Sequence, residues 1–215
     1  MKLPRRPAAV VFDLDGTLID SELLVRDALQ HAARTMGVEM TDAQFLALVG
    51  LQRDTNDQQL LGYYGPDFAL DEFHGHSRAW MGERIAPLKS GVLEILDVVD
   101  ALPAPAGVVT SSSHDWAQRH FGPHKLADRF RAIIARGDYT NAKPHPEPYL
   151  KAAQVLGVAP AAVLAIEDSH TGVRAAHAAG MMTVMAPDLL SADDEMHAKA
   201  LHVVDSLHDV IKLLG

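Results

Sequence analysis

Two carboxylates separated by one residue follow an apolar run near the start of the chain. In the segment VVFDLDGTLIDSE, Asp13 and Asp15 come directly after three apolar residues, and Gly16 follows at once. Along a strand, residues i and i+2 point the same way, so both carboxylates can reach one reacting group. Gly16 allows the chain to turn away sharply. A carboxylate placed in this way can serve as a nucleophile.

Further polar side chains follow other apolar runs. Thr110 opens a row of hydroxyls, TSSS, Lys143 lies in NAKPHPEPYL, and VLAIED ends in Glu167 and Asp168. Several carboxylates around one point repel unless a cation joins them, and oxygen ligands without His or Cys indicate Mg²⁺. The lysine and the hydroxyls then remain to hold an anion beside the metal. A phosphoryl group fits that description, because its transfer requires neutralised oxygens and an in-line nucleophile.

The elements that position these residues are predicted from the apolar runs. Strands are predicted at 8–12, 106–110, 131–135, 163–167, 181–185 and 201–204, and helices at roughly 91–102, 115–121, 146–156, 171–179 and 206–213. The runs lack period-2 alternation, which is typical of strands covered on both faces. Alternating strands and helices predict an α/β fold with a doubly wound, Rossmann-like parallel sheet. In such sheets ligands bind at the carboxyl ends of the strands, where the polar residues fall.

One interval, from about Asp20 to Ala86, contains no strand-like run. It begins with a helix-like stretch, Ser21–Met36, and continues with a capping box of Thr41 and Gln44 that opens a second helix. We therefore predict an α-helical cap domain at 20–86, inserted into an α/β core formed by 1–19 and 87–215.

The composition narrows the class of protein. A content of 48% hydrophobic residues supports a large core, and the formal net charge of −9 without a basic cluster argues against nucleic acid as a partner. There is no cysteine, which excludes disulfides and thiolate chemistry. No apolar stretch approaches the ~20 residues of a membrane span, and the first apolar run is too short for a signal peptide. We expect a cytoplasmic protein with no membrane partner.

Four motifs together resemble a known family. VFDLDGTLIDSE, VVTSSS, KPHPEPYL and IEDSHTGVRAAHAAGM resemble, in order and spacing, the four motifs of the haloacid dehalogenase (HAD) superfamily of phosphohydrolases. The similarity is greatest to its β-phosphoglucomutase-like and phosphoglycolate-phosphatase-like members, which carry a helical cap after the first strand. It covers 8–19 and 87–204, whereas the cap matches by position and helical character.

The resemblance implies roles for the catalytic residues. Asp13 resembles the nucleophile that attacks phosphorus, and Asp15 the acid/base that protonates the leaving oxygen and then activates water. Lys143 resembles the residue that ties the nucleophile to the phosphate and offsets their negative charges. Thr17 is counted among the substrate-binding residues and is expected to orient Asp15.

The resemblance also implies a phosphate site and a metal site. Thr110 resembles the hydroxyl that holds a phosphoryl oxygen, with Ser111 and Ser112 as helpers, although the row of serines leaves the register open by one. Asp168 resembles the Mg²⁺ ligand, joined by Asp13 and the carbonyl group of Asp15. Glu167 is expected nearby, bound directly or through water.

The predicted cap bears on the substrate. In LVGLQRDTND, Gly50 and Arg53 resemble the Gly-x-x-Arg loop of related caps, so Arg53 either meets a substrate anion or is a solvated surface residue. Residues 20–86 contain no lysine. Phosphonoacetaldehyde hydrolases and β-phosphoglucomutase use a cap lysine, and haloacid dehalogenases have no use for Asp15. Simple hydrolysis is therefore the favoured reaction.

The sequence predicts a Mg²⁺-dependent phosphatase that hydrolyses a small organic phosphomonoester, such as a sugar phosphate, through an aspartyl phosphate. Two alternatives stay open: phosphoryl transfer of the β-phosphoglucomutase type, and a non-catalytic phospho-acceptor or binding protein. Response-regulator receivers are phospho-acceptors with a similar set of residues, but they are shorter and lack the second aspartate and a cap. The expected partner is a small phosphate ester, and the expected assembly is a monomer or weak homodimer.

Overall fold

The structure is a computed structural model that describes residues 2–49, 51, 53–82 and 84–215. The chain divides into two compact units. The first comprises Met1–Asp20 with Pro87–Gly215, and the second is Ser21–Ala86. No helix among the described residues is both long enough and apolar enough to cross a membrane.

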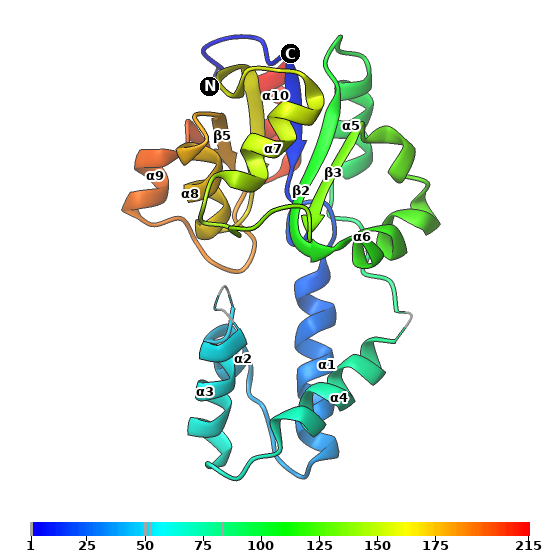
Figure 1. Cartoon of the computed structure of the whole chain (residues 1–215), viewed down its shortest axis with the longest axis vertical. Coiled ribbons are helices and arrows are strands. Elements are labelled where there is room, and N and C mark those ends of the chain that lie inside the picture. Colours follow the sequence, from blue (N-terminus) through cyan, green and yellow to red (C-terminus); the bar gives the residue numbers. More distant parts are fainter. Residues whose placement is uncertain (1, 50, 52, 83) are drawn as a thin grey trace. The chain divides into compact units, whose positions relative to one another are not determined.

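The first unit contains a six-stranded parallel sheet with the strand order β3-β2-β1-β4-β5-β6 (Figure 1). Its strands are β1 (Ala9–Phe12), β2 (Ala106–Ser113), β3 (Ala132–Arg136), β4 (Val163–Glu167), β5 (Met182–Met185) and β6 (His202–Val203). The predicted doubly wound α/β fold is confirmed. The largest difference from the predicted strands is at β2, which continues past Thr110 through Ser113, where its pairing with β3 becomes irregular.

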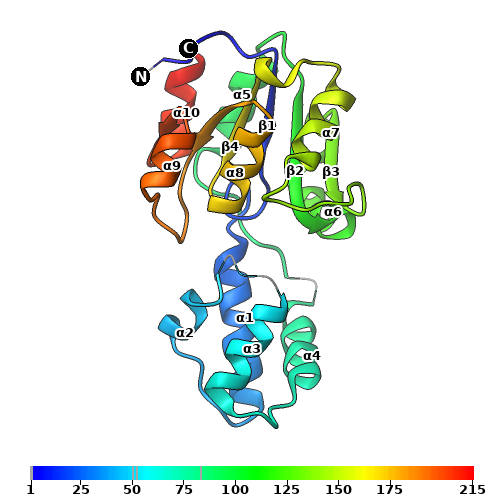
Figure 2. The ribbon, with the colours of Figure 1, turned by 60° about the vertical axis from the view of Figure 1, so that its left-hand side comes forward.

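Helices cover both faces of this sheet. They are α5 (Val92–Asp100), α6 (His114–Phe121), α7 (Glu147–Leu156), α8 (His170–Ala178), α9 (Asp194–Lys199) and α10 (Leu207–Leu214). In Figures 1 and 2, α7 and α8 lie in front of the sheet, and α5 and α10, which pack on each other, lie behind it. The sequence did not predict α9, a short helix capped by the side chain of Asp193.

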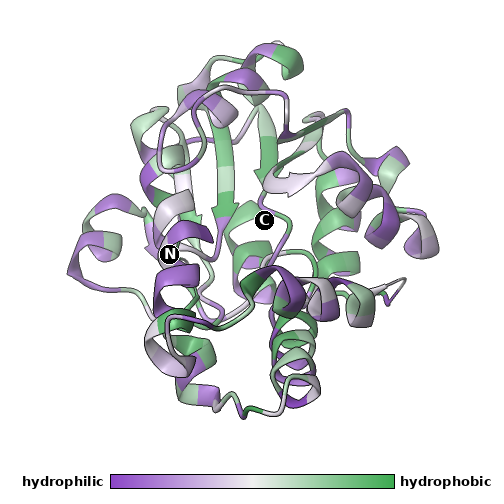
Figure 3. Ribbon diagram, turned by 60° about the horizontal axis from the view of Figure 1, so that its bottom comes forward, coloured by the Kyte–Doolittle hydropathy of each residue, from purple (hydrophilic) through white to green (hydrophobic). Residues whose placement is uncertain are grey.

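The core of the first unit is formed by the apolar strands and the inner faces of the helices. On one face, Val11 and Val109 belong to a buried cluster with Ala152 and Ala176, whose small side chains let α7 and α8 lie close to the sheet. Phe12 follows Val11 and points to the opposite face, where its ring meets Phe130 edge-on. Figure 3 shows the central strands largely in the hydrophobic colour. This buried sheet gives the residues that follow its strands a rigid support.

Helices are the only regular elements among the described residues of the second unit. It contains α1 (Ser21–Thr35), α2 (Asp42–Leu46), α3 (Arg53–Tyr64) and α4 (Leu70–Met81). α1 and α4 pack together, and their buried residues include Ala28, Ala32 and Phe73. The predicted capping box is present, since Thr41 N–H donates to Gln44 Oε1 (2.8 Å) and Gln44 N–H donates to Thr41 Oγ1 (3.2 Å).

Candidate active site

The residues predicted for the site lie at the carboxyl ends of the central strands. Asp13 follows β1, Glu167 ends β4 and Thr110 lies in β2, while Lys143 comes from the segment between β3 and α7. The chain passes from β1 to β2 and β3 on one side, then returns to β4 on the other side of β1. Such a switch in strand order opens a crevice in which ligands bind. The fold therefore brings these residues to one place.

Lys143 is the centre of the buried charges. Its Nζ donates to Asp13 Oδ1 (2.5 Å), to Glu167 Oε1 (2.6 Å) and to the carbonyl oxygen of Val109 (3.0 Å). Its side chain is only 4% exposed. Burial alone would lower the pKa of Lys143, but the charges of Asp13 and Glu167 raise it well above its ordinary value. Lys143 is therefore a permanent cation beside the predicted nucleophile.

Three buried carboxylates surround this lysine. Asp13, Glu167 and Asp168 each place an oxygen within 4.8 Å of the others. Burial is the main cause that raises the pKa of Asp13 to about 8; Glu167 and Asp15 also raise it, and Lys143 lowers it. Burial, followed by the charges of Asp13 and Glu167, raises the pKa of Asp168 well above its ordinary range. One ammonium group cannot neutralise three ionised carboxylates, so without a second cation these carboxyl groups favour their protonated forms.

The donor set fits a hard divalent cation. All the converging groups are carboxylates, the ligands that Mg²⁺ and Ca²⁺ prefer. A fourth carboxylate, Asp188, accepts a hydrogen bond from Lys89 through Oδ1 (2.6 Å). Its other oxygen, Oδ2, is buried and has no hydrogen-bond partner among the described residues. A methyl group built on Gly16 would meet both Asp168 Oδ2 and Asp188 Oδ2, so these two oxygens face the same turn.

Gly16 makes the turn that follows the two aspartates. Its φ of +86° lies in the left-handed region, which favours glycine. A Cβ atom at this position would lie 2.3 Å from Asp168 Oδ2, closer than any real contact. Its N–H donates to the carbonyl oxygen of Ile19 (2.9 Å), which closes the turn. The predicted sharp turn is confirmed, and the glycine also leaves room for a carboxylate of the site.

Glu167 is held against the start of α8. Its Oε2 accepts from Ser169 Oγ (3.1 Å), and its Oε1 accepts from the hydroxyl of Tyr149 as well as from Lys143. A Cβ atom on Gly172 would lie 1.9–2.0 Å from the carboxylate of Glu167. Glycine at this position is therefore required for Glu167 to lie where it does. Ser169 also caps α8 by accepting from the Gly172 N–H (3.1 Å).

Asp15 is held by three donors. Ser112 Oγ (2.7 Å) and Thr110 Oγ1 (3.3 Å) donate to Oδ2, and the indole N–H of Trp116 donates to Oδ1 (2.9 Å). Sequence reasoning missed Trp116, as it missed Tyr149. Trp116 follows the row of serines on α6, and only the fold reveals that its ring reaches the end of β1.

The remaining predicted residues occupy other positions. Thr17, expected to orient Asp15, donates instead to Asp168 Oδ1 (3.1 Å), and Ser111 is exposed at the end of β2. Arg53 is the first residue of α3 in the helical unit, where its half-exposed side chain lies 3.6 Å from Asp57 Oδ2. Gly50 lies outside the described residues.

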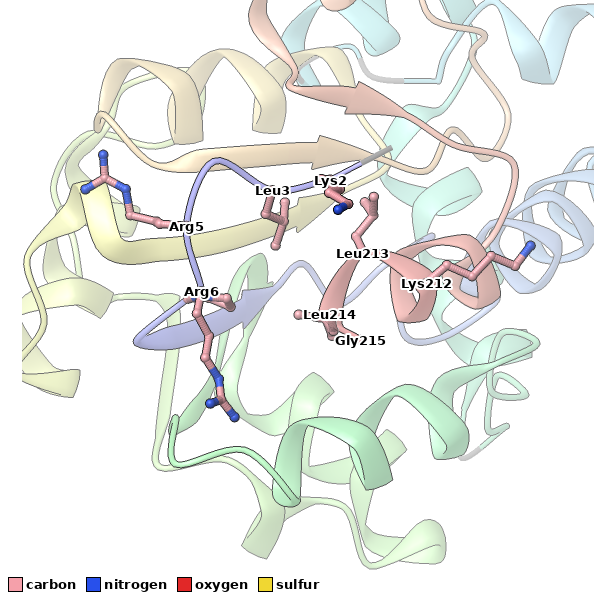
Figure 4. A pocket seen from close by; sticks show the side chains of 9 residues that line it. Lys2, Leu3, Arg5, Arg6, Lys212, Leu213, Leu214 and Gly215 are labelled. Carbon is pink, nitrogen blue, oxygen red and sulfur yellow. The ribbon is translucent and has the colours of Figure 1, made fainter.

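A separate pocket of about 590 Å³ lies before the amino end of β1 (Figure 4). Its basic lining residues are Lys2, Arg5, Arg6 and Lys212. Figure 4 shows the ends of Arg5, Arg6 and Lys212 pointing in different directions, and Lys212 pairs with Asp209 (2.7 Å). These cations do not converge on one ligand, so the carboxyl end of the sheet is the candidate active site.

Comparison with known proteins identifies the family of the chain. The profile of the family described as haloacid dehalogenase-like hydrolase matches residues 10–186. The chain is 30% identical to hexitol phosphatase B of Escherichia coli K12 over 199 residues, which is 87% of this chain and 86% of that protein. It is 29% identical to protein CbbY of Rhodobacter capsulatus, over 92% of each chain. The crystal structure of β-phosphoglucomutase from Clostridium difficile superposes with a TM-score of 0.73 at 24% identity, covering 95% of this chain and 93% of that one, and supports the fold.

The family match spans most of the chain and includes the strand ends that carry Asp13, Thr110 and Asp168 as well as the segment that carries Lys143. The predicted superfamily and the predicted enzyme of the phosphatase class are therefore confirmed. The chain belongs to the haloacid dehalogenase-like hydrolase family.

Proposed function

We propose that this chain is a Mg²⁺-dependent phosphatase that hydrolyses a small organic phosphomonoester through a phosphorylated Asp13. The observation that supports this most strongly is the contact of Lys143 with Asp13 inside a cluster of three buried carboxylates. The relative named hexitol phosphatase B supports a sugar or polyol phosphate as the ester.

In the first step, an Asp13 carboxylate oxygen forms a bond to phosphorus while the bond between phosphorus and the ester oxygen breaks. Lys143 holds Asp13 through Oδ1 and offsets the negative charge that accumulates as nucleophile and phosphate meet. Asp15 gives a proton to the departing oxygen, so the product leaves as an alcohol. Thr110 and the backbone near Ser111 and Ser112 are proposed to hold the phosphoryl oxygens.

In the second step, Asp15 takes a proton from water, and the water oxygen attacks phosphorus. The bond between phosphorus and Asp13 breaks, which releases inorganic phosphate and restores both aspartates. The same carboxylate serves first as acid and then as base, which is why its position must be fixed throughout the cycle.

Asp13, Asp168 and the Asp15 carbonyl group would hold Mg²⁺, with Glu167 beside them or bound through water. When bound, the cation supplies charge neutralisation for the phosphoryl group. The lysine that phosphoryl transfer of the β-phosphoglucomutase type uses in the cap is absent from residues 20–86, and this favours hydrolysis.

A screen of phosphate esters at fixed Mg²⁺ tests the proposal. The purified protein should release inorganic phosphate catalytically, EDTA should abolish the release, and excess Mg²⁺ should restore it. A single release of leaving group with no turnover would indicate a phospho-acceptor. A phosphoryl group transferred to another hydroxyl, followed by ³¹P NMR, would indicate a mutase. No reaction with any ester would contradict the proposal.

A further inference from the structure

Trp116 binds the carboxylate of Asp15 by a contact that the phosphatase motifs do not assign. Its indole Nε1 lies 2.9 Å from Asp15 Oδ1, whereas Oδ2 faces the hydroxyls of Ser112 and Thr110. We propose that Trp116 is the positioning residue of the acid/base. It fixes Asp15 through Oδ1 and leaves Oδ2 as the oxygen that gives and takes the proton. This inference rests on the proposed function and refines it.

The chemistry of the three donors supports the division between the two oxygens. An indole N–H can only donate, so the oxygen that it meets must accept. The unprotonated oxygen of a carboxylic acid is the better acceptor, so this contact favours the proton on Oδ2. Hydroxyl groups can both donate and accept. Ser112 and Thr110 can therefore donate to an ionised Oδ2 and rotate to accept from a protonated one. The two sides of Asp15 thus differ, with a fixed anchor at Oδ1 and an adaptable pair at Oδ2.

The indole is itself held in place from two sides. At the start of α6, the backbone N–H of Trp116 donates to the side chain of Ser113 (3.2 Å), which caps the helix. One turn later, the ring of His120 packs against the indole with centroids 4.2 Å apart. His120 is completely buried, and its Nδ1 lies 2.9 Å from the carbonyl oxygen of Trp116. The indole therefore packs against the buried ring of His120, and that ring is hydrogen-bonded to the backbone of Trp116.

His120 serves here as a neutral ring. A carbonyl oxygen only accepts, so Nδ1 carries the hydrogen, and the buried Nε2 has no hydrogen-bond partner among the described residues. Burial lowers the pKa of His120, although the bond to Trp116 opposes this. A neutral imidazole packs beneath the indole without adding a charge near Asp15.

A positioning role for Trp116 has a consequence that depends on the leaving group. Departure of an alkoxide needs a proton from Asp15, whereas p-nitrophenolate is a stable anion and leaves without one. The ratio kcat/KM reports the steps up to departure of the leaving group. Loss of the indole N–H should therefore lower kcat/KM for an alkyl phosphate and spare it for p-nitrophenyl phosphate.

The test compares Trp116→Phe with wild type on two esters at saturating Mg²⁺. The first is the sugar or polyol phosphate that wild type hydrolyses fastest, and the second is p-nitrophenyl phosphate. We expect kcat/KM for the alkyl ester to fall by roughly 10-fold or more, a part of the ~10²–10⁴ that general acid–base catalysis contributes. For p-nitrophenyl phosphate, kcat/KM should stay unchanged. Its kcat and KM should fall together, because Asp15 still has to activate the water that hydrolyses the phosphorylated Asp13.

Trp80→Phe is the matched control. Trp80 lies on α4 of the helical unit, where the guanidinium of Arg84 packs over its ring. This substitution should leave the relative kcat/KM of the two esters at the wild-type value. The p-nitrophenyl reaction of Trp116→Phe also serves as a folding control, since a misfolded enzyme would lose both activities.

The outcomes separate the two claims. Suppose that wild type hydrolyses both esters. If Trp116→Phe then lowers both kcat/KM values by the same factor, or leaves both unchanged, the positioning role is wrong and the proposed function stands. If wild type releases phosphate from no ester, the proposed function fails, and the role of Trp116 fails with it.

A spectroscopic readout tests the contact without turnover. In the Trp80→Phe background, Trp116 is the only tryptophan, because the chain contains two. Replacing the Asp15 carboxylate by an amide, Asp15→Asn, should shift the emission maximum of Trp116, since a charged acceptor beside the indole N–H is removed. An unchanged spectrum would contradict the contact on which the proposal rests.

Discussion

Lys143 Nζ lies 2.5 Å from Asp13 Oδ1, and the two side chains are only 4% and 10% exposed. This buried pair joins a strand end and a loop that are far apart in the sequence. It links the nucleophile to a permanent positive charge and excludes most water from both. Several expected outcomes depend on it.

Replacing Lys143 by methionine should lower kcat by about 10²–10³, the usual effect of losing one contact that stabilises an oxyanion. Methionine keeps much of the length and removes the charge. Steady-state kinetics with the best ester measures the loss. Lys212→Met is the matched control, because Lys212 is exposed and its one ion pair among the described residues is with Asp209. A variant at Lys143 with more than half of the wild-type kcat would contradict the role.

Mg²⁺ should stabilise the fold more at pH 8.5 than at pH 5.5. The folded-state pKa of Asp13 is raised to about 8, chiefly by burial. The bound proton therefore stabilises the metal-free fold fully below the unfolded pKa of ~3.9, and this contribution is lost as the pH rises through about 8. Mg²⁺ needs the ionised carboxylate and competes with that proton. Thermal unfolding with EDTA or Mg²⁺ measures the gain in Tm; equal gains at both pH values would contradict this linkage.

Gly172→Ala should disturb Glu167 and, through it, Lys143. The added methyl group would lie at 1.9–2.0 Å from the Glu167 carboxylate, so that carboxylate must move. We expect a loss of stability of about 1–3 kcal/mol, typical of overpacking, together with reduced activity. Denaturant unfolding measures the stability. Gly62→Ala on α3 is the control, since its methyl group would meet nothing within 4 Å and should stabilise the helix by roughly 0.5–1 kcal/mol.

Arg53→Ala tests whether this residue of the helical unit recognises the substrate. If Arg53 binds a second anionic group, KM should rise about 10-fold for esters that carry one, consistent with the ~1.5–3 kcal/mol of a hydrogen bond to a charged group. Esters with an uncharged leaving group should keep their KM. Arg34→Ala, at an exposed position near the end of α1, is the matched control. An unchanged KM for every ester would leave Arg53 as a surface residue bonded to Asp57.

The strands and the site carboxylates could be predicted because their signals are local. An uninterrupted apolar run such as AVVF predicts a buried strand, and Asp13 and Asp15 follow it within three residues. Polar contacts between distant segments leave no such pattern. Trp116 reads as an ordinary residue of an amphipathic helix, and Thr17 as a neighbour of Asp15. Only the packing of α6 and α8 on the sheet shows that Trp116 meets Asp15 and that Thr17 meets Asp168.

The boundaries of elements were harder to predict for a related reason. Ser111–Ser113 continue β2 although none of them is buried, so no hydrophobic signal marks the extension. Gly172 illustrates the same limit, because the reason for a glycine there is a carboxylate from the preceding strand.

Phosphorylation of Asp13 in Asp15→Asn tests the central claim most directly. Without the acid/base, p-nitrophenyl phosphate should still transfer its phosphoryl group to Asp13, but water should not be activated to remove it. Rapid quenching with Mg²⁺ present should show a burst of nitrophenolate close to one per chain, and mass spectrometry should find one phosphoryl group on the peptide that contains Asp13. Asp13→Asn should show neither. A burst without that modification, or a phosphoryl group on another residue, would contradict Asp13 as the nucleophile.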